Sequence, residues 1–175
     1  MDSNSIIIII AVAVFAFLVF YTIGVFNRLI NSKNIVNDKW NEIETQLKKK
    51  IEIVSKLIEI VKENAVQEEN VFMMVLASRN KVANAISIND KIDANNKLSN
   101  NLKSLLELQN TYPQLAKNEK VVDLVNELIE IDSKIDYAKE FYNEVASRHN
   151  NKISKIPTSI IAKIFNFNKY ELFKQ

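Results

Sequence analysis

An uncharged apolar run near the N-terminus constrains this chain more than any other feature. It extends from Ile6 to Phe26 and reads IIIIIAVAVFAFLVFYTIGVF. A helix needs about 20 apolar residues to cross the roughly 30 Å hydrocarbon core of a bilayer. A cleavable signal peptide would have a basic segment before a shorter apolar core, but Asp2 is the only charged residue ahead of this run. The run therefore favours a transmembrane anchor over residues 1–27, with a cleaved signal peptide or a buried core helix as the alternatives.

The flanks of the run predict its orientation. Arg28, Lys33 and Lys39 follow it, whereas the short segment before it has no lysine or arginine. Basic residues are enriched on the cytoplasmic side of membrane spans. We therefore expect a single-pass protein of the cell (cytoplasmic) membrane, with its N-terminus outside and its C-terminal domain in the cytoplasm.

The composition predicts an all-α fold. Among 175 residues there are one glycine and two prolines, far fewer than β-rich or mixed folds need for their turns. The absence of cysteine excludes a disulfide framework and thiolate chemistry. A formal net charge of +2 gives no large field to attract nucleic acid.

Apolar spacing predicts two long helices that flank two short ones. Steps of three and four indicate a helix packed at coiled-coil angles. Two successive steps of four, through Ile43, Leu47 and Ile51, should unwind the first seam locally. The first seam consists of Val36, Trp40, Ile43, Leu47, Ile51, Val54, Ile58, Val61 and Ala65, and the last of Val121, Leu124, Leu128, Ile131, Ile135, Ala138, Tyr142, Val145 and His149.

The middle of the chain predicts the two short helices. They should cover Glu68–Ile86 and Ala94–Asn110, with the polar segment 87–96 as their connector and Pro113 as the turn into the last helix. The expected architecture is an up-and-down four-helix bundle over residues 28–155, with long first and fourth helices. Residues 156–175 remain as an amphipathic C-terminal tail.

Several short motifs follow one another through the chain. They are FNRLINSKNIV, KW, QLKKKIEIVSKLIEIVKENAVQEE, ASR, YPQL, AKEFYNEVASRHN and PTSIIAKIFNFNKYELF. In this order and spacing they resemble the bacterial LemA family over nearly everything after the first twenty residues. Ser55 departs from the family pattern, in which a proline is common there. The resemblance implies a four-helix bundle on one membrane anchor and no established catalytic activity.

No catalytic, cofactor-binding or metal-binding motif accompanies this pattern. The chain has no phosphate-binding glycine loop, no GxSxG and no HExxH. A di-iron bundle needs two Glu-x-x-His motifs, whereas the single histidine, His149, follows Glu144 at the wrong spacing. We therefore read His149 as a helix-end residue rather than a ligand, and expect a protein without enzymatic activity or cofactor.

We expect structural rather than binding roles for three further groups of side chains. Arg79 follows the apolar run VFMMVLAS, and counting along parallel helices places it near Asp132, so we predict a partly buried ion pair between them. Met73 and Met74 should fill the core. The lysines at 48–50 point in three directions around a helix with glutamates nearby, which favours a solvated face over a nucleic-acid site.

The helix lengths also predict an interface. The short middle helices shield only the distal half of the long pair, which would leave the membrane-proximal seam exposed, and such apolar stripes usually mark interfaces. The alternative is that the C-terminal tail folds back over it. The candidate interface residues are Leu29, Ile30, Val36, Trp40, Tyr142, Val145 and Ile153.

The tail combines large apolar side chains with a lysine excess. This composition suits a segment lying on anionic lipid and equally suits docking onto the bundle. The candidate membrane-surface residues are Ile160, Ile161, Ile164, Phe165, Phe167, Phe173, Lys163 and Lys169.

These features together favour a non-enzymatic, membrane-anchored helical scaffold or adaptor. Its expected partners are membrane lipid and either a second copy of itself or an unidentified membrane protein, and not nucleic acid. The alternative is a regulatory or accessory subunit of a membrane enzyme, protease or transporter.

Overall fold

The computed structural model describes residues 3–65 and 67–173, and over these residues the chain is all-helical with no strand. The all-α class is therefore confirmed. The first two residues of the predicted anchor and the last two of the predicted tail lie outside the described residues. The helices are α1 (Ser3–Asn64), α2 (Glu69–Asn84), α3 (Ile88–Thr111), α4 (Pro113–Ala116), α5 (Glu119–Ser154) and α6 (Thr158–Ile164).

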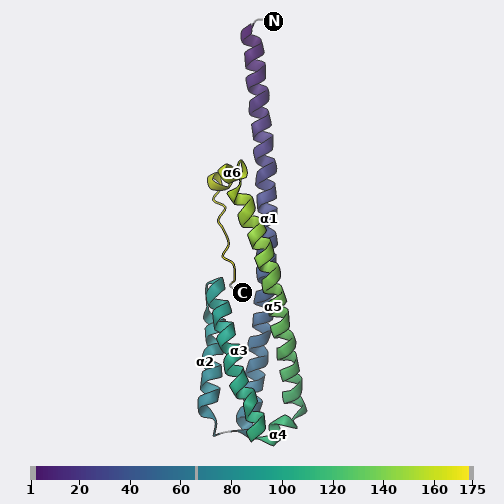
Figure 1. Cartoon of the computed structure of the whole chain (residues 1–175), viewed down its shortest axis with the longest axis vertical. Helices are drawn as coiled ribbons and strands as arrows, with labels where there is room; N and C mark the ends of the chain where they lie inside the picture. The colour runs from purple at the N-terminus through teal and green to yellow at the C-terminus, as the bar shows by residue number, and fades with distance from the viewer. Residues whose placement is uncertain (1–2, 66, 174–175) are drawn as a thin grey trace. The chain divides into compact units, whose positions relative to one another are not determined.

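Helix α1 carries the apolar run and continues without interruption for 62 residues (Figure 1). It contains a stretch long and apolar enough to cross a membrane, and no residue of that stretch is buried. Inside the run, the Thr22 hydroxyl donates to the Leu18 carbonyl oxygen at 2.8 Å. A polar side chain that is satisfied by its own helix is compatible with a lipid environment.

The chain divides into two compact units. The terminal unit combines Met1–Lys39 with Phe141–Gln175, and the central unit is Trp40–Glu140. Helices α1 and α5 each contribute residues to both units.

Buried side chains of α1 in the central unit follow an unbroken heptad pattern. Among the buried positions, Ile43, Leu47, Lys50, Val54, Leu57 and Val61 alternate steps of four and three, and Ile53 is buried next to Val54. The predicted break in the pattern is therefore wrong: Lys50 takes the core position, while Ile51 and Ile58 are only half-buried. The last seam is confirmed in the central unit, where the buried positions of α5 are Val121, Leu128, Ile131, Ile135 and Ala138.

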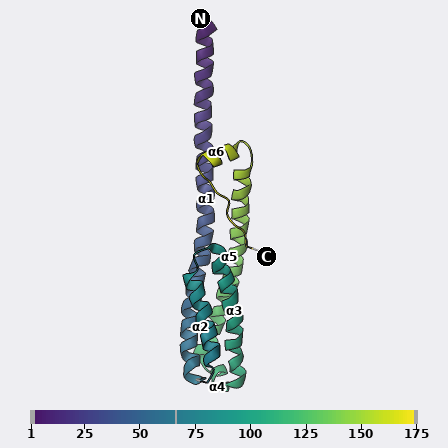
Figure 2. The ribbon, with the colours of Figure 1, turned by 90° about the vertical axis from the view of Figure 1, so that its left-hand side faces the viewer.

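Helices α2 and α3 pack side by side in the central unit (Figure 2). Helix α3 begins earlier than predicted, because the hydroxyl of Ser87 caps it by accepting from the Asp90 N–H at 3.0 Å. Ile92 and Ala94 are buried on this first part of the helix. Burial of this face outweighs the weak helix preference of the polar residues between 87 and 96, so that segment is not a connector.

The break at Pro113 is confirmed. Proline lacks an N–H and fits the first turn of a helix, and here Pro113 begins the four-residue α4. Before it, the Tyr112 hydroxyl donates to Glu68 Oε1 at 3.2 Å, and after it Leu115 is fully buried. This corner precedes the last long helix, α5.

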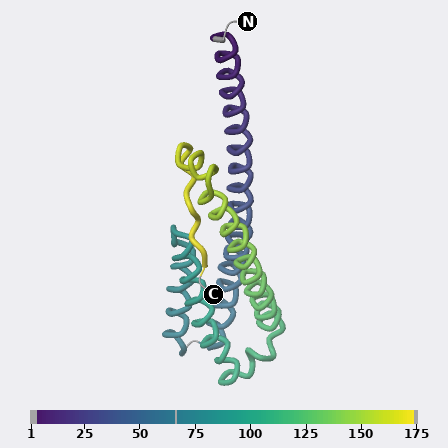
Figure 3. Tube along the Cα trace, turned by 45° about the horizontal axis from the view of Figure 1, so that its top comes forward, coloured from purple at the N-terminus to yellow at the C-terminus, as the bar shows by residue number. Residues whose placement is uncertain are grey.

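The terminal unit contains the first part of α1, the end of α5, α6 and the extended return segment 167–173. Figure 3 shows the return segment leaving α6 and running back beside the last turns of α5. Within this unit, contacts of α6 and the start of the return segment lie at the end of the apolar run, and they belong to the candidate site.

Candidate functional site

Helix α6 docks at the C-terminal end of the apolar run. Its Ile161 and Ala162 are buried in one cluster with Val25 and Leu29 of α1 and Ile153 of α5. The ring of Phe26 lies 4.8 Å from that of Phe165 and 5.9 Å from that of Phe167. Apolar burial and aromatic edge contacts therefore attach α6 to the point where the apolar run ends.

A local backbone motif turns the chain back after α6. The Phe167 N–H donates to the Ala162 carbonyl oxygen at 2.9 Å, and the Asn166 N–H donates to that of Lys163 at 3.3 Å. Asn166 has a φ of 54°, in the left-handed region. This is the Schellman arrangement, in which asparagine is the commonest substitute for glycine. The sequence FNFN thus ends α6 and starts the return segment.

Two asparagines of α5 hold the return segment by its backbone. Asn150 donates to the Tyr170 carbonyl oxygen and accepts from the Tyr170 N–H, both at 2.8 Å. Asn143 binds Phe173 in the same way, at 3.0 and 2.8 Å. Seven helical residues rise about 10.5 Å and three extended residues span about 10 Å, so the two spacings match.

The side chains of the return segment cover α5. The Tyr142 hydroxyl donates to the Glu171 carbonyl oxygen at 3.2 Å, and the Phe173 ring packs 4.9 Å from the Tyr142 ring. Burial raises the pKa of Tyr142 to about 12. The Tyr170 hydroxyl bonds Asn37 Oδ1 on α1 at 3.0 Å, so the segment bridges both helices.

The predicted exposed interface is therefore wrong for most of its residues. Leu29, Val36, Tyr142 and Ile153 are buried, and the α6 region and return segment cover the proximal seam as the alternative interpretation proposed. Val145 is half-buried and only Ile30 stays exposed.

Trp40 belongs to the central unit, where it is half-buried. The ammonium of Lys91 lies 5.9 Å from the centre of its ring and also pairs with Glu44. This ion pair lowers the pKa of the Glu44 carboxyl.

The predicted membrane-surface residues of the tail divide into two groups. Ile161 and Phe173 are buried and Phe167 is half-buried, so these three dock onto the protein. The other predicted residues are exposed, and the side chain of Ile156, which was not predicted, is also exposed, at 82%. The tail therefore docks by one side and presents the other, which consists of Ile156, Ile160, Lys163, Ile164, Phe165 and Lys169.

The centre of the central unit holds a buried lysine that the sequence did not single out. Lys50 is completely buried, and its ammonium donates to Asp132 Oδ1 at 2.5 Å and to Ser99 Oγ at 2.6 Å. Burial lowers the pKa of Lys50, and the hydrogen bond and charge of Asp132 oppose this effect. The solvated-face interpretation holds for Lys48 and Lys49, which are exposed, but not for Lys50.

The predicted Arg79–Asp132 pair is replaced by two other contacts. Asp132 binds Lys50, whereas Arg79 Nε donates to the Ser55 hydroxyl at 2.9 Å. Ser55 lies close enough to α2 to accept the guanidinium N–H, while Lys50 already occupies the core position beside Asp132. Asp132 was correctly expected in a partly buried ion pair, but its cation comes from α1.

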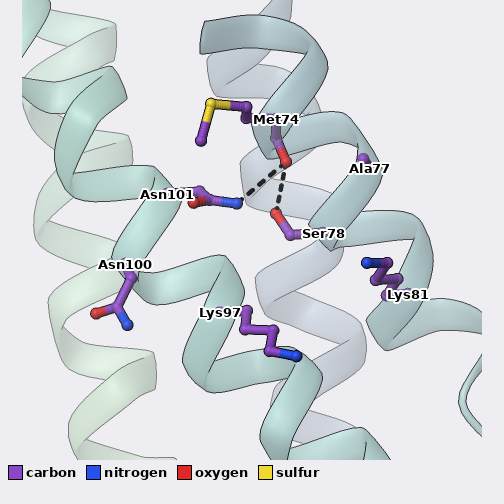
Figure 4. Close-up of a pocket in the computed structure, with 7 residues that line it drawn as sticks. All are labelled: Met74, Ala77, Ser78, Lys81, Lys97, Asn100 and Asn101. Carbon is purple, nitrogen blue, oxygen red and sulfur yellow. Dashed lines mark hydrogen bonds between the residues drawn. The ribbon is translucent and has the colours of Figure 1, made fainter.

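A cavity of about 380 Å³ lies between α2 and α3 (Figure 4). At one side of it the Asn101 amide and the Ser78 hydroxyl both donate to the Met74 carbonyl oxygen, at 3.2 and 2.9 Å. Met73 and Met74 are 58% and 54% exposed, so the expectation that they fill the core is wrong. The polar groups that these bonds join satisfy one another, and the cavity offers no distinct ligand chemistry.

A second cavity, of about 450 Å³, lies in the terminal unit. It is lined by Phe26, Ile30 and Lys33 of α1, by His149 of α5 and by residues 165–170. His149 is 1% exposed, so it is a buried residue, and its ring lies 5.2 Å from that of Tyr170. We name this cavity the His149 pocket.

Within the described residues no group of three His, Cys, Asp or Glu side chains is arranged to hold a metal ion. The features that the sequence analysis missed are Lys50 and the pair Asn143 and Asn150. The spacing of the asparagines, each next to a seam residue, was their only signal in the sequence.

These observations define an all-helical protein with one N-terminal helix able to span a membrane and a tail docked beside it. The sequence model of the LemA family matches residues 39–175, which is most of the chain, and the chain belongs to the LemA family. No curated protein matches the chain in sequence.

Proposed function

We propose that this protein is a non-enzymatic, membrane-anchored helical scaffold or adaptor that binds itself or a partner protein at the membrane surface. The observation that carries the proposal is the continuity of α1, whose exposed apolar run and buried core positions belong to one helix. A helix that is apolar all round and unburied is suited to lipid rather than to water. The same helix then supplies the core of the central unit, so the anchor needs no linker.

The proposed orientation places the N-terminus outside and the central unit in the cytoplasm. Its support is the basic flank after the apolar run, including Arg28 and Lys33. Both residues precede the central unit on α1.

The proposed architecture of the central unit is an up-and-down four-helix bundle. Lys50 of α1 contacts both α3 and α5, Arg79 of α2 contacts Ser55 of α1, and Asn101 of α3 contacts α2. These contacts connect α1, α2, α3 and α5 to one another, as expected for a bundle in which each helix packs on its neighbours.

The outer face of α5 supplies the proposed binding surface. Val122, Ile129 and Tyr137 are 42%, 61% and 66% exposed, and they recur at spacings that place them on one side of the helix. Glu130 pairs with Lys134 beside them and keeps the neighbouring face polar. Exposed apolar residues on one side of a helix are available to a partner protein that packs along it.

Site-specific photo-crosslinking from position 129 in intact cells tests this proposal, with the full-length protein at natural abundance. Position 130 is the matched control, since Glu130 is one residue away and faces solvent. A position-129 product at twice the monomer mass supports self-assembly, and a product with a second protein supports an adaptor. Equal or absent products at both positions would contradict the proposed surface.

A second protein recovered at constant stoichiometry would favour the accessory-subunit alternative. In that case the partner supplies the activity, and the helical unit positions or regulates it. Substoichiometric or variable recovery of several proteins would instead favour the adaptor.

A further inference from the structure

One residue that lines the His149 pocket, His149 itself, has a buried polar atom without a partner. His149 Nδ1 is buried and makes no hydrogen bond within the described part of the chain, whereas a hydrogen bond with the backbone of Asn168 acts on the imidazole. Leaving a buried nitrogen unpaired costs free energy, and native proteins rarely do so without a functional reason. The pocket that this ring lines is therefore a candidate for a polar ligand.

The charges around the pocket favour an anion. Lys33 and Lys169 line it, and no carboxylate is among the described residues that do. Burial lowers the pKa of His149, the charges of Lys152 and Lys33 lower it further, and the hydrogen bond with the backbone of Asn168 opposes this effect. An anion among these groups would gain charge-assisted hydrogen bonds from both lysines, and it would favour the protonated imidazole, which donates from Nδ1.

The apolar part of the lining favours a ligand with a hydrophobic portion. Phe26 is the last residue of the apolar run, Ile30 lies one helical turn beyond it, and Phe165 at the end of α6 packs on Phe26. The volume of about 450 Å³ suits a polar headgroup rather than two acyl chains. The exposed side chains of Ile164 and Phe165 and the exposed apolar run of α1 offer a surface for chains that leave the pocket.

We propose that the His149 pocket binds the phosphate-bearing headgroup of an anionic phospholipid, with Lys33, Lys169 and His149 Nδ1 contacting the phosphate. This inference rests on the membrane anchoring in the proposed function, which places the end of the apolar run at the lipid headgroups. The shared chemistry is a phosphate ester, and the apolar lining assigns the lipid rather than a soluble phosphate as its source.

Because His149 is the only histidine, the full-length protein gives one set of imidazole NMR signals when no histidine tag is used. The protein is placed in phosphatidylcholine nanodiscs, and the fraction of phosphatidylglycerol is increased stepwise. We expect a saturable shift of the imidazole signal and a rise in the pKa of His149 by about one unit or more, as an opposite charge at contact distance produces. Inorganic phosphate and glycerol phosphate, added to phosphatidylcholine nanodiscs, test the soluble source.

The variants Lys33→Gln and Lys169→Gln separate pocket binding from the general potential of an anionic surface. Lys163→Gln is the matched control, because Lys163 is exposed and does not line the pocket. For each pocket variant we expect the lipid fraction that half-saturates the imidazole shift to rise at least about tenfold. The control variant should have the same half-saturating fraction as the wild type.

Three results would overturn the proposal. The first is an equal lipid response in the control and in the double pocket variant, which would mean surface potential alone. The second is saturation by soluble phosphate without a lipid response, which would assign a soluble ligand. The third is no response to either. Incorporation into nanodiscs reports anchoring separately, so failure of the pocket is distinguishable from failure of the proposed function.

Discussion

The ion pair between buried Lys50 and partly exposed Asp132 predicts that replacing the aspartate destabilises the protein more than replacing the lysine. The Lys50 side chain is 1% exposed, whereas that of Asp132 is 39% exposed. Replacing Asp132 by asparagine removes the negative charge beside the buried ammonium and leaves it only neutral hydrogen-bond acceptors, the amide oxygen of the new side chain and the Ser99 hydroxyl. Replacing Lys50 by methionine instead removes the buried charge and leaves a carboxylate that water can reach.

The expected magnitudes follow from this asymmetry. Breaking a fully buried pair by removing one partner costs about 3–5 kcal/mol, and access of water to Asp132 should reduce this to about 2–3 kcal/mol for Asp132→Asn. Lys50→Met should change the free energy of unfolding by less than about 1 kcal/mol, because an apolar side chain of similar length fills the core. In the double variant the cost of Asp132→Asn should largely disappear, which gives a coupling energy of about 2 kcal/mol.

The assay is urea unfolding of the full-length protein in detergent micelles. Fluorescence of Trp40, the only tryptophan, reports on the central unit. Glu130→Gln is the control, since it removes an exposed carboxylate from the same helix and should leave stability unchanged. If Lys50→Met destabilises the protein more than Asp132→Asn, the assignment of the cost to a buried unpaired ammonium is refuted.

Three further predictions concern the terminal unit. Asn150→Ala should raise deuterium uptake at 170–173, because it removes both hydrogen bonds that hold Tyr170; unchanged uptake would contradict the clamp. The pKa of Tyr142, raised to about 12, means that stability present below pH 10 is lost as pH rises through about 12, and Tyr142→Phe should lack this loss in alkaline unfolding curves. The pKa of His149 is lowered, so stability should fall as pH drops below about 6.5 towards its folded-state pKa; His149→Phe should abolish that part of the slope.

The long helices were predictable because their patterns are local. Val121 through Ala138 mark one face of α5 at helical spacing, and the lack of breakers allowed α1 to be read as continuous. A local pattern identifies the buried face only where that face is apolar. Lys50 is a charged residue on the buried face, so the apolar pattern did not identify it. Its burial depends on Asp132 and Ser99, which lie on other helices.

The site at the end of the apolar run was harder to predict because its contacts are distant in sequence. The composition of the tail indicated an amphipathic segment, but not which of its apolar residues would dock onto the protein. In the structure some of them are buried and the others are exposed. The decisive signal was the match between Asn143, Asn150 and the backbone of residues 170–173, which only the folded chain brings together. His149, which the sequence pattern showed only as the last residue of the seam, lines a pocket in the folded chain.

Single-cysteine labelling tests the central claim of membrane anchoring most directly. The chain has no cysteine, so Ser5→Cys and Ser133→Cys each introduce one exposed thiol, on α1 ahead of the apolar run and on α5 in the central unit. With a membrane-impermeant maleimide and intact cells, we predict that position 5 is labelled in the full-length protein, whereas position 133 is labelled only after lysis. Labelling of position 133 in intact cells, or recovery of a mature chain without residue 5, would contradict the account.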